Sequence, residues 1–123
     1  MAWTLDSDRP IYLQLVEVIQ MRIVSGTYQA GSRLPSVREL ATEAGVNPNT
    51  MQKALSELER SGLVITQRTS GRTVTENASL IGNIRQSLAK EQMKLFFQKM
   101  KKLGYKQPDI AALIKQADEE GNI

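Results

Sequence analysis

The chain is 123 residues long with 41% hydrophobic and 24% charged residues, which fits one globular unit or one domain with an appendage. It contains no cysteine and no histidine, so it lacks disulfides, thiolate chemistry and the commonest general base and metal ligand. We therefore expect no catalytic residues, no metal and no cofactor. No apolar run approaches the roughly 20 residues of a membrane span and no export signal opens the chain, so we expect a cytoplasmic protein without a membrane partner.

The net charge of +3 is small, but the types of cation divide along the chain. Seven of the eight cations in residues 1–75 are arginines, with Lys53 as the exception, and seven of the eight in residues 76–123 are lysines, with Arg85 as the exception. Arginine suits bidentate recognition of phosphates and guanines, whereas lysine suits a hydrated surface. This division favours a recognition surface in the first part and solvated helix faces in the second.

The first predicted helix spans residues 10–25. Pro10 suits an early helical position, and Gly26 suits a left-handed helix end. An apolar stripe with a 3.6-residue period predicts the side of the helix that faces the core, and it consists of Ile11, Leu15, Val18, Ile19 and Ile23.

Two short helices are predicted next, joined by a tight turn. Ser36 and Glu39 have the spacing of a capping box at the start of the first, which ends at Gly45. Val46 is expected to be buried in the turn. The second begins at once, because Asn47 is a good N-cap and is followed by proline, and it ends at residue 62.

A β-hairpin is predicted after these helices. Its strands are residues 63–67, with Leu63 and Ile65 facing inward, and residues 72–75, with Val74 facing inward. A three-residue tip containing Ser70 connects them.

The remaining sequence predicts two further helices. A long helix over residues 77–103 carries two rotated apolar stripes, and a shorter helix begins around Pro108. Residues 118–123 are expected to be frayed.

The pair of short helices has the features of a helix-turn-helix motif. Ala41 is small where the two helices approach each other, Gly45 allows a positive φ in the turn, and Met51 anchors the second helix in the core. The alternative is a helical hairpin that binds nothing. The order of three helices and a hairpin, however, predicts a winged helix-turn-helix. The expected fold is therefore mainly α with a small β-hairpin wing (residues 1–75), followed by a two-helix dimerisation element (residues 76–123).

Polar side chains gather on the predicted outer face of this motif. Asparagine, glutamine and threonine at the start of the second short helix can pair with base edges in the major groove of DNA, and the arginines can bind phosphate. On these grounds the expected DNA-contacting residues are Ser36, Arg38, Asn49, Thr50, Gln52, Lys53, Arg68 and Arg72.

The strings PIYLQL, LPSVRELA, GVNPNTMQKALSELERSGLV and SGRTV resemble the DNA-binding domain of the GntR family of bacterial transcription regulators. The resemblance covers residues 9–75 without a gap. It implies a regulator, which we expect to be a repressor, that binds an inverted-repeat operator in double-stranded DNA. It also places seven residues on the DNA-contact positions of the family, namely Arg38, Asn47, Asn49, Thr50, Gln52, Lys53 and Gly71.

The two-helix tail resembles that of the small YtrA-like subgroup, whose tail helices dimerise. Two helices are too few to enclose a pocket of roughly 300–1,000 Å³ easily, so we expect no separate effector domain, and a small-molecule effector stays open. The tail has more apolar surface than its own short helix can cover, which favours a homodimer. The expected interface residues are Ile84, Leu88, Met93, Phe96, Phe97, Met100, Leu113 and Ile114. The alternative is that the tail packs onto its own DNA-binding domain, and both arrangements can hold together.

Two other functions are compatible with a fold of this kind. A winged helix can act as an adaptor for protein or RNA, although the polar start of the second short helix argues against this. An enzyme would have to use carboxylates such as Glu39, Glu57 and Glu59, which are better interpreted as a helix cap and solvated helix positions.

Overall fold

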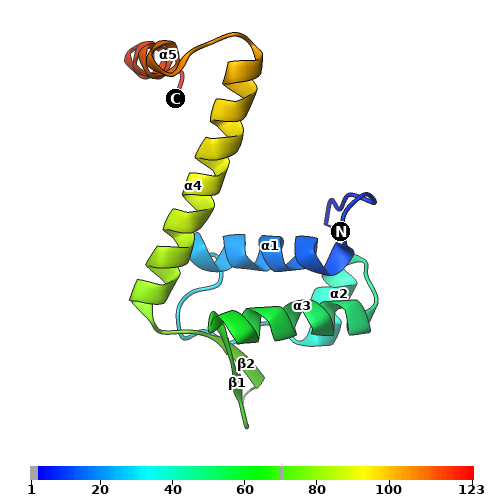
Figure 1. Ribbon diagram of the computed structural model, residues 1–123. Helices are drawn as coiled ribbons and strands as arrows, with labels where there is room; N and C mark the ends of the chain where they lie inside the picture. The colour runs from blue at the N-terminus through cyan, green and yellow to red at the C-terminus, as the bar shows by residue number, and fades with distance from the viewer. Residues whose placement is uncertain (1–2, 70) are drawn as a thin grey trace. The chain divides into compact units, whose positions relative to one another are not determined.

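The computed structural model describes residues 3–69 and 71–123, so Ser70 in the predicted hairpin tip lies outside the described residues. Five helices and one antiparallel hairpin are found in this part of the chain, which confirms the prediction of a mainly α fold with a small β-hairpin (Figure 1). In chain order the elements are α1 (Ile11–Val24), α2 (Val37–Ala44), α3 (Pro48–Ser61), β1 (Val64–Gln67), β2 (Gly71–Val74), α4 (Ala78–Lys102) and α5 (Gln107–Glu119). The chain divides into two compact units, residues 1–84 and residues 85–123, and the division falls inside α4.

The core of the first unit lies between α1, α2 and α3. Leu15 and Ile19 from α1, Leu40 from α2, and Met51 and Leu55 from α3 are all fully buried. These residues come from the apolar stripes of the sequence, so removal of the stripes from water is what packs the three helices together.

The ends of α2 and α3 confirm the predicted caps. The Ser36 hydroxyl accepts a hydrogen bond of 3.1 Å from the Glu39 amide, and the Glu39 carboxylate accepts one of 3.3 Å from the Ser36 amide. The side chain of Asn47 caps α3, which opens with proline. Gly45 has a φ of 75°, as the turn requires. Val46 is only half-buried, so its predicted burial in the turn is wrong.

The hairpin, called the wing below, differs from the prediction in one strand. Leu63 and Val64 are both buried, and Ile65 is 42% exposed, so the prediction that Ile65 faces inward is wrong. Leu63 still belongs to the connection after α3, and the alternation of side chains begins only with Val64, which pairs with Val74. Val74 is buried as predicted.

Residues 31–34, between α1 and α2, extend the wing on its free edge. The Leu34 amide donates a hydrogen bond of 2.9 Å to the Arg72 carbonyl, and Arg33 lies opposite Thr73 as an antiparallel partner. No strand was predicted from the sequence here. The segment covers the open side of β2 and brings Arg33 to the wing.

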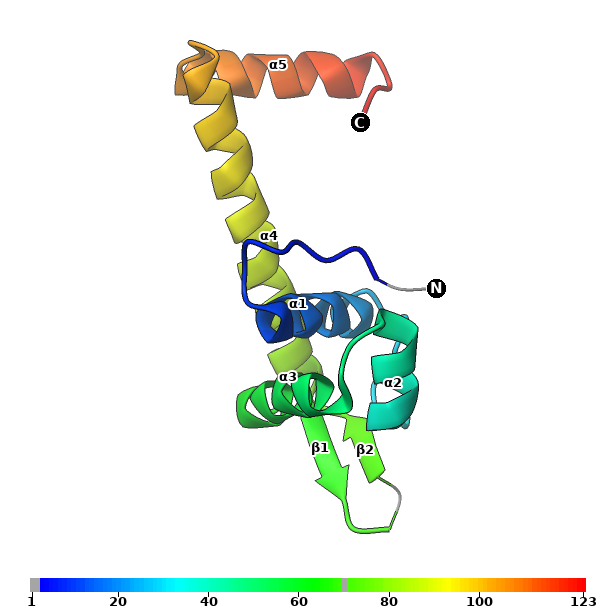
Figure 2. The ribbon, with the colours of Figure 1, turned by 90° about the vertical axis from the view of Figure 1, so that its right-hand side faces the viewer.

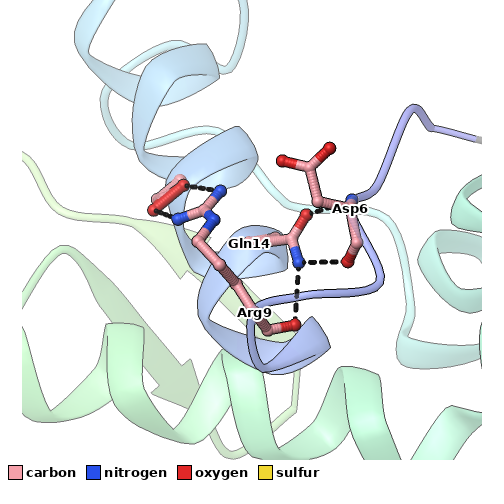
Figure 3. Close-up of polar contacts among 4 residues, drawn as sticks. Asp6, Arg9 and Gln14 are labelled. Atoms are coloured by element: carbon pink, nitrogen blue, oxygen red, sulfur yellow. Dashed lines mark hydrogen bonds and ion pairs between the residues drawn. The ribbon is translucent and has the colours of Figure 1, made fainter.

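The segment before α1 is held against that helix by a buried glutamine, as Figure 3 shows. Gln14 is 4% exposed. Its amide nitrogen donates to the carbonyls of Asp6 (2.7 Å) and Arg9 (3.0 Å), and its amide oxygen accepts from the Asp6 amide (2.7 Å). The buried polar group is therefore satisfied, and it fixes the path of the chain into α1.

A second contact ties the same segment to both α1 and α2. The carboxylate of Glu43 accepts hydrogen bonds from the Trp3 indole (2.6 Å) and from the Arg22 guanidinium (2.7 Å). That guanidinium also lies 4.7 Å from the centre of the Trp3 ring. The hydrogen bonds from Arg22 and Trp3 hold the pKa of the Glu43 carboxyl below its ordinary value.

The second unit contains most of α4 and all of α5. Among its described residues only Ile110 is classed as buried, whereas Met93, Phe96 and Leu103 are 54%, 42% and 72% exposed. Helix α5 continues to Glu119, so the expected fraying of the tail is wrong for residues 118 and 119. Within the described part of the chain, no helix is long and apolar enough to cross a membrane.

Candidate nucleic-acid interface

The first turns of α3 present a polar surface. Burial of Met51, Ala54, Leu55 and Leu58 on one side of the helix leaves Asn49, Gln52 and Lys53 exposed on the other, with Thr50 half-buried. The side-chain amides of Asn49 and Gln52 form no hydrogen bond with any described residue, so their donors and acceptors are available to a ligand. Asn47 differs, because its side-chain oxygen accepts a hydrogen bond of 2.7 Å from the Asn49 amide. Its side chain shapes the start of the helix.

The charged group of Lys53 lies against α1. Its Nζ is 3.9 Å from the centre of the Tyr12 ring, which is a cation–π distance. The sequence analysis predicts that Lys53 contacts DNA. It does not indicate the contact with Tyr12, because the two residues are 41 positions apart in the chain.

Three arginines, Arg33, Arg38 and Arg72, line a hollow of about 780 Å³ between the start of α2 and the wing. Arg38 and Arg33 are both exposed and make no hydrogen bond or ion pair with a described residue. Ser36 lines the same hollow, but its hydroxyl is occupied by the helix cap. Arg33 was not among the predicted contact residues. The excess of arginine in residues 1–75 was the only sequence signal that included it.

The wing carries the other predicted contacts. Arg68 is exposed and has no partner among the described residues, and Gly71 has a φ of 76°, which favours glycine. Arg72 is placed differently. Its side chain is 20% exposed, and its Nε donates a hydrogen bond of 2.6 Å to Glu59 of α3.

Glu59 also contacts the other wing strand. Its second carboxylate oxygen accepts a hydrogen bond of 2.8 Å from the Thr66 hydroxyl. Burial disfavours the charged carboxylate, but the hydrogen bonds from Arg72 and Thr66 outweigh it, so the pKa of Glu59 is lowered. The sequence interpretation of Glu59 as a solvated helix position is wrong, because it joins α3 to both strands.

The first unit therefore combines a helix-turn-helix, an α3 start with unpaired amides, and a wing with exposed arginines; Figure 2 shows the wing next to α2 and α3. These features define a DNA-binding protein of the winged helix-turn-helix class. The family described as "Bacterial regulatory proteins, gntR family" matches residues 11–74. The chain belongs to this GntR family, as its sequence motifs predicted.

Similarity to known proteins extends beyond the DNA-binding unit. The chain is 39% identical over 115 residues to the uncharacterized HTH-type transcriptional regulator YhcF of Bacillus subtilis, covering 94% of this chain and 95% of YhcF. It is 42% identical over 89 residues to the HTH-type transcriptional repressor YtrA of the same organism, covering 72% of this chain and 68% of YtrA. A GntR family transcriptional regulator from Listeria monocytogenes has a similar structure, with a TM-score of 0.82, 42% identity and coverage of 91% of this chain and 98% of that chain. The matched proteins are regulators, in agreement with the expectation that the chain is not an enzyme.

Proposed function

We propose that this GntR-family DNA-binding regulator is a transcriptional repressor that binds an inverted-repeat operator as a homodimer. The observation that carries the proposal is the surface formed by the start of α3, Arg38 and the wing. It offers neutral amides at a helix start of the kind that reads the major groove, beside cations that can bind the phosphate backbone. The relative YtrA is a transcriptional repressor, which favours repression over activation for this chain.

The proposed DNA-binding surface has two kinds of contact residue and a set of residues that support them. Asn49, Thr50, Gln52 and Lys53 are candidates for base contacts or nearby phosphates, and Arg38 and Arg68 are candidates for phosphate contacts. Asn47 and Ser36 support the surface by capping the two helices. Gly71 supports it by its backbone conformation.

The proposed dimer uses the unit of residues 85–123 together with Ile84, the last residue of the first unit. Large apolar side chains there are exposed to a degree that is unusual for a monomeric protein, including Leu95 at 50%, Phe96 at 42% and Ile114 at 38%. A second copy of the chain can cover this surface through a symmetric interface. The proposed interface residues are those expected from the sequence, Ile84, Leu88, Met93, Phe96, Phe97, Met100, Leu113 and Ile114. A two-fold dimer would place its two α3 helices on half-sites about one or more DNA turns apart.

Selection of bound sites from a random pool of duplex DNA tests this function. We expect enrichment of one inverted repeat, and we expect the purified chain to bind it with the stoichiometry of one dimer. Transcription from a promoter that overlaps the selected site should fall when the protein is added. Selection without enrichment, together with retained binding to RNA or to a protein, would favour the adaptor function instead.

A further inference from the structure

The wing places its arginines on opposite faces. Residues that pair across neighbouring strands share a face, and successive residues of a strand alternate between faces. Arg33 lies opposite Thr73, whereas Arg72 pairs with Thr66. Because Thr73 and Arg72 are successive residues, the side chain of Arg33 belongs to the face away from that of Arg72.

On the inner face, the charge of Arg72 is cancelled within the protein. Its guanidinium is bonded to the Glu59 carboxylate at 2.6 Å, and the two side chains are only 20% and 31% exposed. A phosphate that approached this pair would meet a net charge near zero. The ion pair uses the Nε of Arg72, and its carboxylate would repel a phosphate that approached the terminal N–H groups of the same guanidinium.

On the outer face, Arg33 keeps its full charge. Its guanidinium lies over Gly71, where the Nε would be 3.8 Å from an added Cβ, and it makes no hydrogen bond or ion pair with a described residue. It lines the same hollow as Arg38 and Arg72. The charge of Arg72 is paired with Glu59, whereas Arg33 and Arg38 have no such partner among the described residues. These two uncompensated cations therefore face one concave surface between the helix-turn-helix and the wing.

We propose that Glu59 is a positioning residue that locks the wing to α3 through Arg72 and Thr66, and that Arg33, rather than Arg72, joins Arg68 in supplying the phosphate-binding charge of the wing. This inference rests on the proposed DNA-binding function. It assigns a DNA contact to a residue that the sequence motifs did not single out, and it gives Arg72 a role within the protein.

The dependence of DNA affinity on salt distinguishes the two arginines. Each phosphate neutralised by a protein cation contributes about 0.9 to the slope of log K against log salt concentration. R33Q should make the slope shallower by about 0.9 on both operator and scrambled duplex. The double variant R72Q/E59Q removes the neutral pair without leaving an unpaired carboxylate, so it should leave the slope unchanged while it lowers operator affinity. R60Q serves as the control for charge, because Arg60 is exposed near the end of α3 and is paired only with Glu57.

A second pair of variants tests the positioning role. E59Q removes the charge that holds Arg72, so the freed guanidinium should make the slope steeper by up to about 0.9, while the ratio of operator to scrambled binding falls because the wing is less fixed. E57Q makes the same change of charge two residues away and should alter neither quantity. T66V removes only the second hydrogen bond and should lower the ratio without changing the slope.

The outcomes separate this inference from the proposed function. If the unaltered chain does not distinguish any operator from scrambled duplex, the proposed function fails. If it does, but R72Q/E59Q makes the slope as shallow as R33Q does, or R33Q leaves it unchanged, the assignment of Arg33 is overturned. An unchanged slope and ratio for E59Q would overturn the positioning role. Each variant is measured well below its own unfolding temperature, so lost affinity is not confused with lost structure.

Discussion

The ammonium group of Lys53 lies 3.9 Å from the centre of the Tyr12 ring, so a cation–π contact joins α3 to the start of α1. Lys53 is exposed and Tyr12 is half-buried. The contact draws the charge of Lys53 toward α1, where it supports the packing of the two helices. Its contribution to stability can be measured separately from any contact with DNA.

A double-mutant cycle between Lys53→Met and Tyr12→Leu measures this contact. Methionine keeps the apolar stem without the charge, and leucine removes the aromatic face. We expect a coupling of about 0.5–1 kcal/mol in the free energy of unfolding from urea denaturation, the size found for exposed cation–π pairs. A coupling of zero would show that the ammonium does not interact with the ring in solution.

The exposed apolar surface of residues 85–123 predicts a second result. Replacement of both Phe96 and Met100 by aspartate should place charges in the proposed interface and make association unfavourable. Sedimentation equilibrium should then give the mass of one chain where the unaltered protein gives that of two.

Ala112→Asp provides the control for the dimer. Ala112 is exposed on α5, on the side of the helix away from the fully buried Ile110, and the substitution also adds a negative charge. This variant should remain a dimer. If the Phe96 and Met100 variant also stays dimeric, the interface lies elsewhere on the chain.

The contact of Glu43 with Arg22 and Trp3 predicts a dependence of stability on pH. The folded-state pKa of Glu43 is lowered from its ordinary value of 4.5, first by the hydrogen bond from Arg22 and then by that from Trp3. The unfolded state therefore binds a proton more readily. The stabilisation is fully present above the ordinary pKa and is lost as the pH falls through the lowered one.

Thermal unfolding of Glu43→Gln across the acid range measures this effect. The variant should unfold at a lower temperature than the unaltered protein near neutral pH, and the difference should shrink as the pH falls through the lowered pKa of Glu43. Trp3→Phe, which removes only the indole donor, should reproduce part of the change. A difference that is the same at every pH would contradict the assigned cause.

Local signals in the sequence were sufficient to predict the helices and the residues that cap them. The Ser36 cap and the glycine after α2 act within one turn of backbone, so their chemistry is visible in the residues themselves. The hairpin and the inward side of its second strand were also predicted, but the inward side of its first strand was not, because Leu63 and Val64 are both apolar and either can begin the alternation. The edge segment at Arg33 requires pairing with Thr73, 40 positions later, which no local pattern reveals.

The sequence predicts which residue types form the candidate DNA-contact surface, but not which of their side chains form ion pairs within the protein. Exposure of Asn49 and Gln52 follows from burial of the opposite side of α3. The charge of Arg72 in β2 is neutralised by Glu59 in α3, and the two residues are 13 positions apart in the sequence. Gln14 presents the same difficulty, since its burial depends on the path of residues 6–9, and nothing in its helical position distinguishes it from a solvated glutamine.

Asn49 occupies the most favourable position for reading bases. Its backbone amide is held by the Asn47 cap at 2.7 Å, while its side chain is exposed and makes no hydrogen bond to a described residue. A fixed backbone limits the ordering cost of a contact, and the free amide can pair with adenine through two hydrogen bonds. Because the side chain is neutral, it releases no counterions and cannot supply the salt-dependent part of binding.

Asn49→Ala should therefore reduce specificity and leave general affinity almost unchanged. We expect the ratio of operator to scrambled binding to fall by the equivalent of about 1–3 kcal/mol, the discrimination of one good bidentate pair. Competition titration at one salt concentration, with both duplexes present, measures the ratio directly. Asn83→Ala is the matched control, because Asn83 is an exposed asparagine of α4 outside the proposed contact surface, and it should leave the ratio unchanged. Equal losses on both duplexes would mean that Asn49 only positions the backbone, and base recognition would then have to come from Gln52 and the wing.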